Sequence, residues 1–111
     1  MKEIKAIIQP FMLERVLDAL SAYGELPGLT ISRVQGWGRD RGSTGGPIVG
    51  GHGLAEECKL EIVVHDDVAD EIAGVIARAA HTGQPSDGKI FVSHVADVIR
   101  IQTGARGHGA V

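Results

Sequence analysis

The sequence predicts an α+β fold in a single domain over residues 1–111, with two β-α-β units separated by a long loop. Two segments place apolar residues at helical spacing, with one apolar stripe in each. Short segments rich in β-branched residues flank both of them. The length of 111 residues fits one domain with its own core.

The first β-α-β unit lies at the N-terminus. Residues 3–9 are rich in isoleucine and stop at Pro10, so they predict a strand, and Pro10 fits the first turn of a helix. The helix ends at Gly24, and residues 29–35 alternate and predict a second strand. The apolar stripe of this helix consists of Leu13, Val16, Leu17 and Leu20.

The second unit begins with residues 57–64, which alternate and place Cys58 on the apolar face as a buried, unreactive thiol. Asp66 and Asp67 precede a helical stripe, so we expect them to cap that helix and complement its dipole. The stripe consists of Val68, Ile72, Val75, Ile76 and Ala79. The remaining segments are a turn at 81–88, strands at 89–95 and 97–101, and a flexible tail at about 104–111.

This order is the ferredoxin-like pattern βαββαβ. Each helix has a single apolar stripe, so both helices must cover the same face of the sheet. The strands carry apolar residues on the other face too, for example Val63 and Phe91. An apolar outer face predicts oligomerisation through it. The alternative is that these residues are strand-end positions.

Composition excludes several classes of protein. A net charge of −3 argues against a nucleic-acid or anionic-membrane footprint over the whole surface. No apolar run approaches the 18 or so residues of a membrane helix, and the first residues read directly into a strand without a signal peptide. A single cysteine excludes an internal disulfide framework. We therefore expect a cytoplasmic protein that is not embedded in a membrane.

Glycine is concentrated in one place: eight of the 16 glycines fall between Gly36 and Gly53. In the segment Gly36–Gly42, glycines let the backbone approach an anion, and Arg39 and Arg41 add donors. The spacing and the absence of a following helix exclude a Rossmann fingerprint. The alternative is a flexible hairpin loop with solubilising charges.

The segment Gly83–Ile90 matches the first seven positions of a P-loop, but Ile90 stands where Ser or Thr would bind Mg²⁺. A strand follows instead of a helix, which excludes a Walker site. Lys89 can still hold a phosphate as a point charge, and the alternative is a plain Asp-Gly turn. Arg100, in a predicted strand, needs an anionic partner: Asp97, another carboxylate or a ligand phosphate.

Taken together, these segments identify a resemblance over nearly the whole chain. The chain resembles the PII signal-transduction family in the stretches Ala6–Phe11, Gly36–Gly42, Glu61–Asp67, Thr82-Gly83, Asp87–Val92 and Val98–Gly104. The resemblance implies a homotrimer of ferredoxin-like subunits that binds adenine nucleotides (ADP, AMP or ATP) in clefts between subunits. It also implies that the loop at about 40–55 regulates a target protein, a membrane transporter or a metabolic enzyme.

The resemblance also implies a set of site residues. Gly36, Gly38 and Arg39 would approach the nucleotide, Asp87, Gly88 and Lys89 would close over its phosphates, and Arg100 would add charge. Thr30 matches an adenine contact, and Ile7 and Val63 match apolar positions in the cleft. Asp40 and Gln102 occupy two further family positions, beside Mg²⁺ and near the outer phosphates.

Several residues depart from the family pattern. The loop has no tyrosine to modify, and its glycines predict disorder without a partner. Glu57 stands where the family has a lysine, which argues against 2-oxoglutarate as an effector. Gln102 replaces an arginine, which favours ADP or AMP relative to ATP. A small anion such as bicarbonate, and Mg²⁺ beside Asp40, stay open as further ligands. Related PII-like groups are associated with bicarbonate handling or heavy-metal efflux.

Three functions stay open at this stage. A regulator that senses nucleotide is favoured, because no evident base or nucleophile accompanies the phosphate-facing residues. A slow nucleotide phosphohydrolase would need Asp40 to activate water. A metal-binding trimer linked to heavy-metal efflux would need residues such as His52 and His108 to meet across subunits, since no histidine has a ligand-spaced partner.

Overall fold

The computed structural model describes residues 1–24, 26–37, 48–49 and 53–111. Its strands are β1 (Lys2–Ile8), β2 (Thr30–Gly36), β3 (Ile48–Val49), β4 (Leu54–Val64) and β5 (Gly88–His94). Its α-helices are α1 (Leu13–Leu20) and α2 (Asp66–Ala80), and three short 3₁₀ helices cover Pro10–Met12, Pro85–Asp87 and Gly107–Ala110. These elements confirm the predicted βαββαβ order, with β3 as an addition in the long loop.

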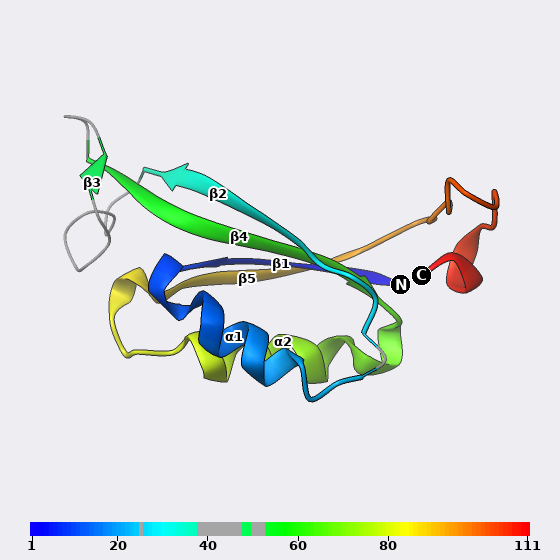
Figure 1. The fold of residues 1–111 in the computed structure, drawn as a ribbon, viewed down its shortest axis with the longest axis horizontal. Helices are drawn as coiled ribbons and strands as arrows, with labels where there is room; N and C mark the ends of the chain where they lie inside the picture. The colour runs from blue at the N-terminus through cyan, green and yellow to red at the C-terminus, as the bar shows by residue number, and fades with distance from the viewer. Residues whose placement is uncertain (25, 38–47, 50–52) are drawn as a thin grey trace.

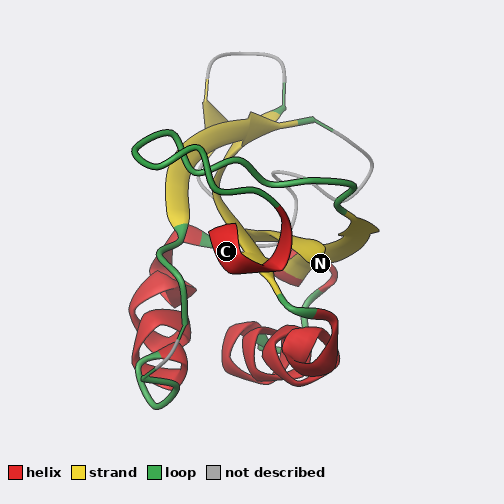
Figure 2. Cartoon of the chain, turned by 90° about the vertical axis from the view of Figure 1, so that its right-hand side faces the viewer, coloured by secondary structure: helices red, strands yellow, loops and turns green. Residues whose placement is uncertain are grey.

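The strands form one antiparallel sheet in the order β2-β4-β1-β5, with β3 paired to β4. This is the ferredoxin-like arrangement, in which the first strand of each unit lies at the centre of the sheet. Both helices pack against the same face, as Figure 2 shows below the yellow sheet. The prediction that both cover one face is confirmed.

Alternation along the strands explains the core. Ile4, Ala6 and Ile8 of β1 point to the helix side and are buried, as are Leu60 and Ile62 of β4. The helices meet them with Val16 and Leu20 of α1 and with Ile72 and Ile76 of α2. Cys58 is fully buried in this core, as predicted. Within the described residues, neither helix combines the length and apolarity needed to span a membrane.

The opposite face of the sheet has no helix over it (Figure 2). Register places Ile7, Lys59 and Lys89 together in one row on this face, and Lys5 beside Phe91 in the next. Apolar and charged side chains therefore alternate on this face, where Phe91 is 53% exposed. Oligomerisation through this face stays a prediction.

The predicted strand over residues 97–101 is wrong. The last strand of the sheet ends at His94, and the chain then leaves the sheet as an arm (orange in Figure 1). Within the arm, the amide of Arg100 donates to the Ala105 carbonyl at 2.8 Å, and Gly107 donates to Val98 at 3.0 Å. Gly104 and Gly107 both adopt positive φ, of 72° and 74°, so this segment folds back on itself instead of pairing with the sheet. We call residues 95–106 the arm.

The C-terminal residues return from the arm to the body of the protein. The short helix Gly107–Ala110 lies where we predicted a tail at 104–111, and Ala110 is buried. Most of the predicted loop, at about 40–55, lies outside the described residues. Its described parts pair Ile48 with Ala55 and Val49 with Leu54. The predicted disorder of the loop therefore stays a prediction.

Asp66 and Asp67 occupy the first turn of α2, where negative charge complements the helix dipole. The N-cap position is His65, and no side chain caps the helix there. Asp66 instead lies 2.9 Å from the amino group of Met1. A hydrogen bond from that amino group lowers the pKa of Asp66. The dipole role fits the structure, while the predicted capping hydrogen bond is not formed.

Candidate functional site

The predicted site residues that the structure describes on the strands fall into two groups at opposite ends of the sheet. At one end, β1 and β5 place Ile7 opposite Lys89 and Ile8 opposite Gly88. At the other end, β1 and β4 place Glu3 opposite Val63. Four residues along a strand span about 13 Å, at roughly 3.3 Å per residue. We call the first group the Lys89 end and the second the Val63 end.

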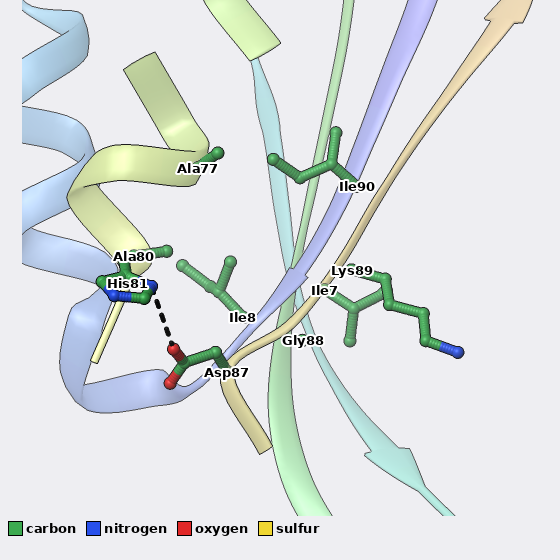
Figure 3. Close-up of a pocket in the computed structure, with 9 residues that line it drawn as sticks. All are labelled: Ile7, Ile8, Ala77, Ala80, His81, Asp87, Gly88, Lys89 and Ile90. Carbon is green, nitrogen blue, oxygen red and sulfur yellow. Dashed lines mark ion pairs between the residues drawn. The ribbon is translucent and has the colours of Figure 1, made fainter. Parts of the chain in front are cut away.

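The Lys89 end contains a cavity of about 310 Å³ at the junction of β1, β5 and the last turn of α2. Figure 3 shows its lining: Ala77 and Ala80 from α2, His81 directly after it, Ile7 and Ile8 from β1, Asp87 just before β5, and Gly88, Lys89 and Ile90 from β5. The Lys89 side chain is exposed and extends away from α2, on the side of the sheet that no helix covers. An exposed ammonium group beside a cavity is suited to an anion.

Gly88 is required where the loop enters β5. Its φ is 105°, a conformation that L side chains rarely adopt. A Cβ atom at this position would lie 1.7 Å from the carbonyl oxygen of Ile7. Only glycine lets β5 approach β1 this closely, so Gly88 has a structural reason independent of any ligand.

Asp87 organises the loop that precedes β5. Its carboxylate accepts hydrogen bonds from the amides of Thr82 at 2.7 Å and Gly83 at 2.9 Å, and from the Thr82 hydroxyl. Burial raises the pKa of Asp87, but these hydrogen bonds outweigh it, so the pKa lies below its ordinary value. Like charges repel, so the carboxylate itself is unsuited to a phosphate. Its contribution to the Lys89 end is to fix the main chain.

Two residues that the sequence analysis did not select support the same loop. His81 Nδ1 lies 3.7 Å from the Asp87 carboxylate (Figure 3). The Gln9 amide donates a hydrogen bond to the Ser86 hydroxyl at 2.9 Å, and Gln9 is only 4% exposed. Gln9 lies within the matched stretch Ala6–Phe11, and His81 directly precedes Thr82-Gly83. The contact of Gln9 joins residues 77 positions apart, which no local pattern indicates, whereas His81 and Asp87 are close in the sequence.

The Val63 end contains a second cavity, of about 350 Å³. Thr30 and Val63, which the resemblance assigned to an adenine contact and to the apolar lining of the cleft, both line it. Ile7, which the resemblance also assigned to that lining, does not. The other lining residues are Glu3, Pro27, Gly28, Glu61, Ile62, Val98, Ala110 and Val111. Glu61 lies 3.4 Å from the Lys59 ammonium group. The cavity is therefore mostly apolar with a few polar groups, the usual character of a small-molecule pocket.

Arg100 and Gln102 are both exposed on the arm, beyond the Val63 end of the sheet (Figure 1). The sequence left Asp97 open as the partner of Arg100, but Asp97 is held by Arg106, at 2.8 Å from Nε and 2.6 Å from the terminal nitrogen. These contacts lower the pKa of Asp97. Among the residues that the structure describes, the Arg100 guanidinium forms no ion pair. Arg100 is exposed and lies outside the strands, so the burial on which the sequence argument for an anionic partner rested is not found.

The base of the loop is described in part. Gly36 ends β2 opposite Ala55 of β4. Gly38, Arg39 and Asp40 lie outside the described residues. Glu57 is 6% exposed and lies opposite Val34 of β2. A carboxyl side chain therefore occupies a buried position at this end of β4, and the expectation that it disfavours a dianion stays a prediction.

No metal centre is formed by the described part of the chain, since it holds no cluster of three His, Cys, Asp or Glu side chains suited to an ion. His108, which we considered as a metal ligand, stacks on His65 with ring centroids 5.4 Å apart and an interplanar angle of 8°. His52 lies outside the described residues.

Comparison with known proteins gives a consistent result. The family model described as nitrogen regulatory protein P-II matches residues 1–105. Nitrogen regulatory protein P-II of Azospirillum brasilense is 40% identical over 115 residues, covering all of both chains. Nitrogen regulatory protein P-II 1 of Escherichia coli K12 is 44% identical over 114 residues, again covering all of both chains. A P-II protein of Klebsiella oxytoca shares the same 44% identity.

Proposed function

The chain belongs to the P-II family of nitrogen regulatory proteins, and on that premise we propose that it is a signalling regulator that binds an adenine nucleotide between the subunits of a homotrimer. The nucleotide is ADP, AMP or ATP. The loop at about 40–55 then contacts a target protein, a membrane transporter or a metabolic enzyme. The regulatory role follows from the family, while the nucleotide, the trimer and the target belong to the proposal.

The separation of the two ends carries this proposal. The cavity beside Lys89 and the cavity beside Val63 share no lining residue. Arg100 lies on the arm beyond the Val63 end, whereas Lys89 begins β5 at the far end of the sheet (Figure 1). A single chain therefore has two half-sites. Two copies packed through the uncovered sheet face would bring the Lys89 end of one against the Val63 end of the next.

The charges suit an adenylate in such a joint site. Lys89 and Arg100 are exposed, and Arg100 has no ion-pair partner among the described residues. Together with Arg39, which the resemblance adds, they would offset the two or three negative charges of the phosphates. The apolar walls and the Thr30 hydroxyl at the Val63 end would take the base. Mg²⁺ would bind on the phosphate side, beside Asp40.

The test mixes two variants, each of which weakens nucleotide binding through a different half-site. Lys89→Ala removes charge from one half-site and Arg100→Ala from the other, and each is expected to weaken ATP and ADP binding about tenfold or more in calorimetry. Subunits of both variants are then refolded together in equal amounts. If the site is shared between subunits, about one quarter of the sites combine two intact halves and recover the original affinity.

Arg15→Ala is the matched control, because Arg15 lies on the outer side of the helices and away from both half-sites. It is expected to bind nucleotide normally. A mixture that recovers no sites, although each variant alone is defective, would place the whole site within one subunit. Normal binding by Lys89→Ala would remove this end of the sheet from the site.

The target and the pathway need a separate experiment. A pull-down with and without ADP and ATP identifies a partner whose binding changes with nucleotide. Nitrogen metabolism, bicarbonate handling and metal efflux predict different partners. Bicarbonate as a small effector and the exclusion of 2-oxoglutarate are tested by titrating each in the presence of nucleotide. A cytoplasmic location stays a prediction of the sequence.

A further inference from the structure

The C-terminal turn of the chain, which we define as residues 107–111, forms one wall of the cavity at the Val63 end. Ala110 and Val111 line this cavity together with Thr30 and Val63, the pair that the proposed function assigns to the base. Ala110 is 8% exposed. In Figure 2 the turn, marked C, lies in front of the end of the sheet and close to the N-terminus.

Contacts to the arm and to the start of α2 hold this turn in place. The Gly107 amide donates hydrogen bonds to the Val98 carbonyl at 3.0 Å and to the Asp97 carboxylate at 3.1 Å, which secures its first residue to the arm. The stacking of His108 on His65 then joins it to the start of α2. His65 and His108 are 43 positions apart, so this contact is tertiary and fixes the direction of the turn.

The surroundings of the turn make the stack important. A third cavity, of about 370 Å³, lies on its other side and is lined by Tyr23, His65 and Val111 among others. Val111 therefore borders two cavities, so this residue is not held by close packing on all sides. The ring stack is therefore one of the contacts that position this turn, beside the packing that buries Ala110.

We propose that the C-terminal turn is the base-selecting wall of the nucleotide site, and that the stack of His65 and His108 positions it. This inference rests on the proposed function and adds residues 107–111 to its site. Ala110 and Val111 present small apolar groups to one face of the bound base, opposite the Thr30 and Val63 side of the cavity. His108 touches no ligand in this arrangement and is a positioning residue.

The test replaces His108 and separates base recognition from phosphate recognition. His108→Ala removes the stack, and His108→Phe keeps an aromatic ring. Calorimetry measures the binding of ATP, GTP and inorganic tripolyphosphate, which probes the phosphate half alone. Hydrogen exchange of residues 107–111 reports whether the turn is held.

For His108→Ala we expect a roughly two- to tenfold loss of ATP affinity, a fall in the ratio of ATP to GTP affinity, and unchanged tripolyphosphate affinity. Exchange at residues 107–111 should become faster. His108→Phe should restore both the affinity ratio and the slow exchange. If His108→Ala proves unstable, His65→Phe serves as the second variant and should behave like wild-type protein.

The outcomes separate this inference from the proposed function. Unchanged ATP affinity and base preference in His108→Ala would overturn the role of the C-terminal turn as a base-selecting wall. The proposed nucleotide binding would still stand. An equal loss of ATP and tripolyphosphate affinity would also overturn it, because it would indicate general damage. If wild-type protein binds no nucleotide at all, the proposed function fails and the inference fails with it.

Discussion

The two ends of the sheet are built by different means. At the Lys89 end, backbone hydrogen bonds and one sterically required glycine set the geometry, through Asp87 and Gly88. At the Val63 end, side chains from separate segments surround an apolar cavity, and the wall formed by Ala110 depends on a ring stack. The first end is fixed by contacts around one loop, while the second depends on how separate segments of the chain pack together.

The Lys89 end shows how a loop that is not followed by a helix can still present positive charge to an anion. In a P-loop, amide groups face the phosphate and a helix follows. Here the amides of Thr82 and Gly83 are directed at the Asp87 carboxylate instead. The loop is therefore held by an internal anion, and the charge offered outward comes from Lys89. This arrangement predicts that fold stability and ligand affinity can be separated by mutation.

The largest expected effect is that of Gly88→Ala. The new Cβ would overlap the Ile7 carbonyl oxygen and would also require an unfavourable φ, so β5 must separate from β1 at this point. We expect a loss of about 3 kcal/mol or more in the free energy of unfolding. Urea denaturation followed by circular dichroism measures it, and nucleotide binding should be lost with it.

Gly83→Ala is the matched control for this substitution. Gly83 also has a positive φ, of 91°, but a Cβ there would meet no atom within 4 Å. Only the backbone strain remains, which costs about 1–2 kcal/mol. Equal losses at the two glycines would show that strain alone acts, and that the close approach of β1 and β5 adds nothing.

The second effect is that of Asp87→Asn. An amide group provides one acceptor oxygen instead of a charged pair, so the hydrogen bonds from Thr82 and Gly83 are weakened. We expect a loss of about 1–3 kcal/mol in the free energy of unfolding. Nucleotide affinity should fall as well, because the loop that presents Lys89 is loosened.

The same variant tests the lowered pKa of Asp87. Because the folded pKa lies below the unfolded value of about 3.9, this carboxylate stabilises the fold above that pH and loses its effect as pH falls through the folded pKa. The difference in stability between wild type and Asp87→Asn should therefore shrink as pH is lowered from 5 towards 2. Asp66 and Asp97 titrate in both proteins and cancel in the comparison. A difference that is constant over this range would contradict the assignment.

Local sequence patterns predicted the strands and helices, because each has a single clear periodicity. The bounds differ in places: the first helix was predicted to end at Gly24, but α1 ends at Leu20. The local patterns failed at residues 97–101. The alternation there is typical of a strand, but the segment folds back on itself within the arm.

The resemblance assigned Ile7 and Val63 to one cleft, but strand register places Ile7 beside Lys89 and Val63 towards the other end of the sheet. The roles of Gln9 and His108 could not be predicted, because each depends on a contact between distant segments. His81 lies close to Asp87 in the sequence, but no motif marks a histidine there as a partner of that carboxylate.

A smaller effect, confined to the Val63 end, is expected for Thr30→Val. Thr30 lines the cavity and is exposed at the edge strand β2, so the loss of its hydroxyl should change the free energy of unfolding by less than about 0.5 kcal/mol. ATP affinity should fall roughly two- to tenfold, the value of one hydrogen bond. Calorimetry and urea denaturation of the same sample test both statements. A large loss of stability would mean that this end is not separable from the fold.

The last prediction concerns Gln9, which connects the Lys89 end to the β1–α1 junction. Its amide nitrogen binds Ser86, but its Oε1 atom is buried with no hydrogen-bond partner among the described residues. Gln9→Met loses the hydrogen bond and also removes the unpaired carbonyl, so the two costs oppose each other. We expect the free energy of unfolding to change by less than about 1 kcal/mol. Gln9→Glu, of the same size, buries a charge and should cost about 2 kcal/mol or more. Near-equal stabilities of the two variants in urea denaturation would show that this position is not desolvated, and that the loop is held by Asp87 alone.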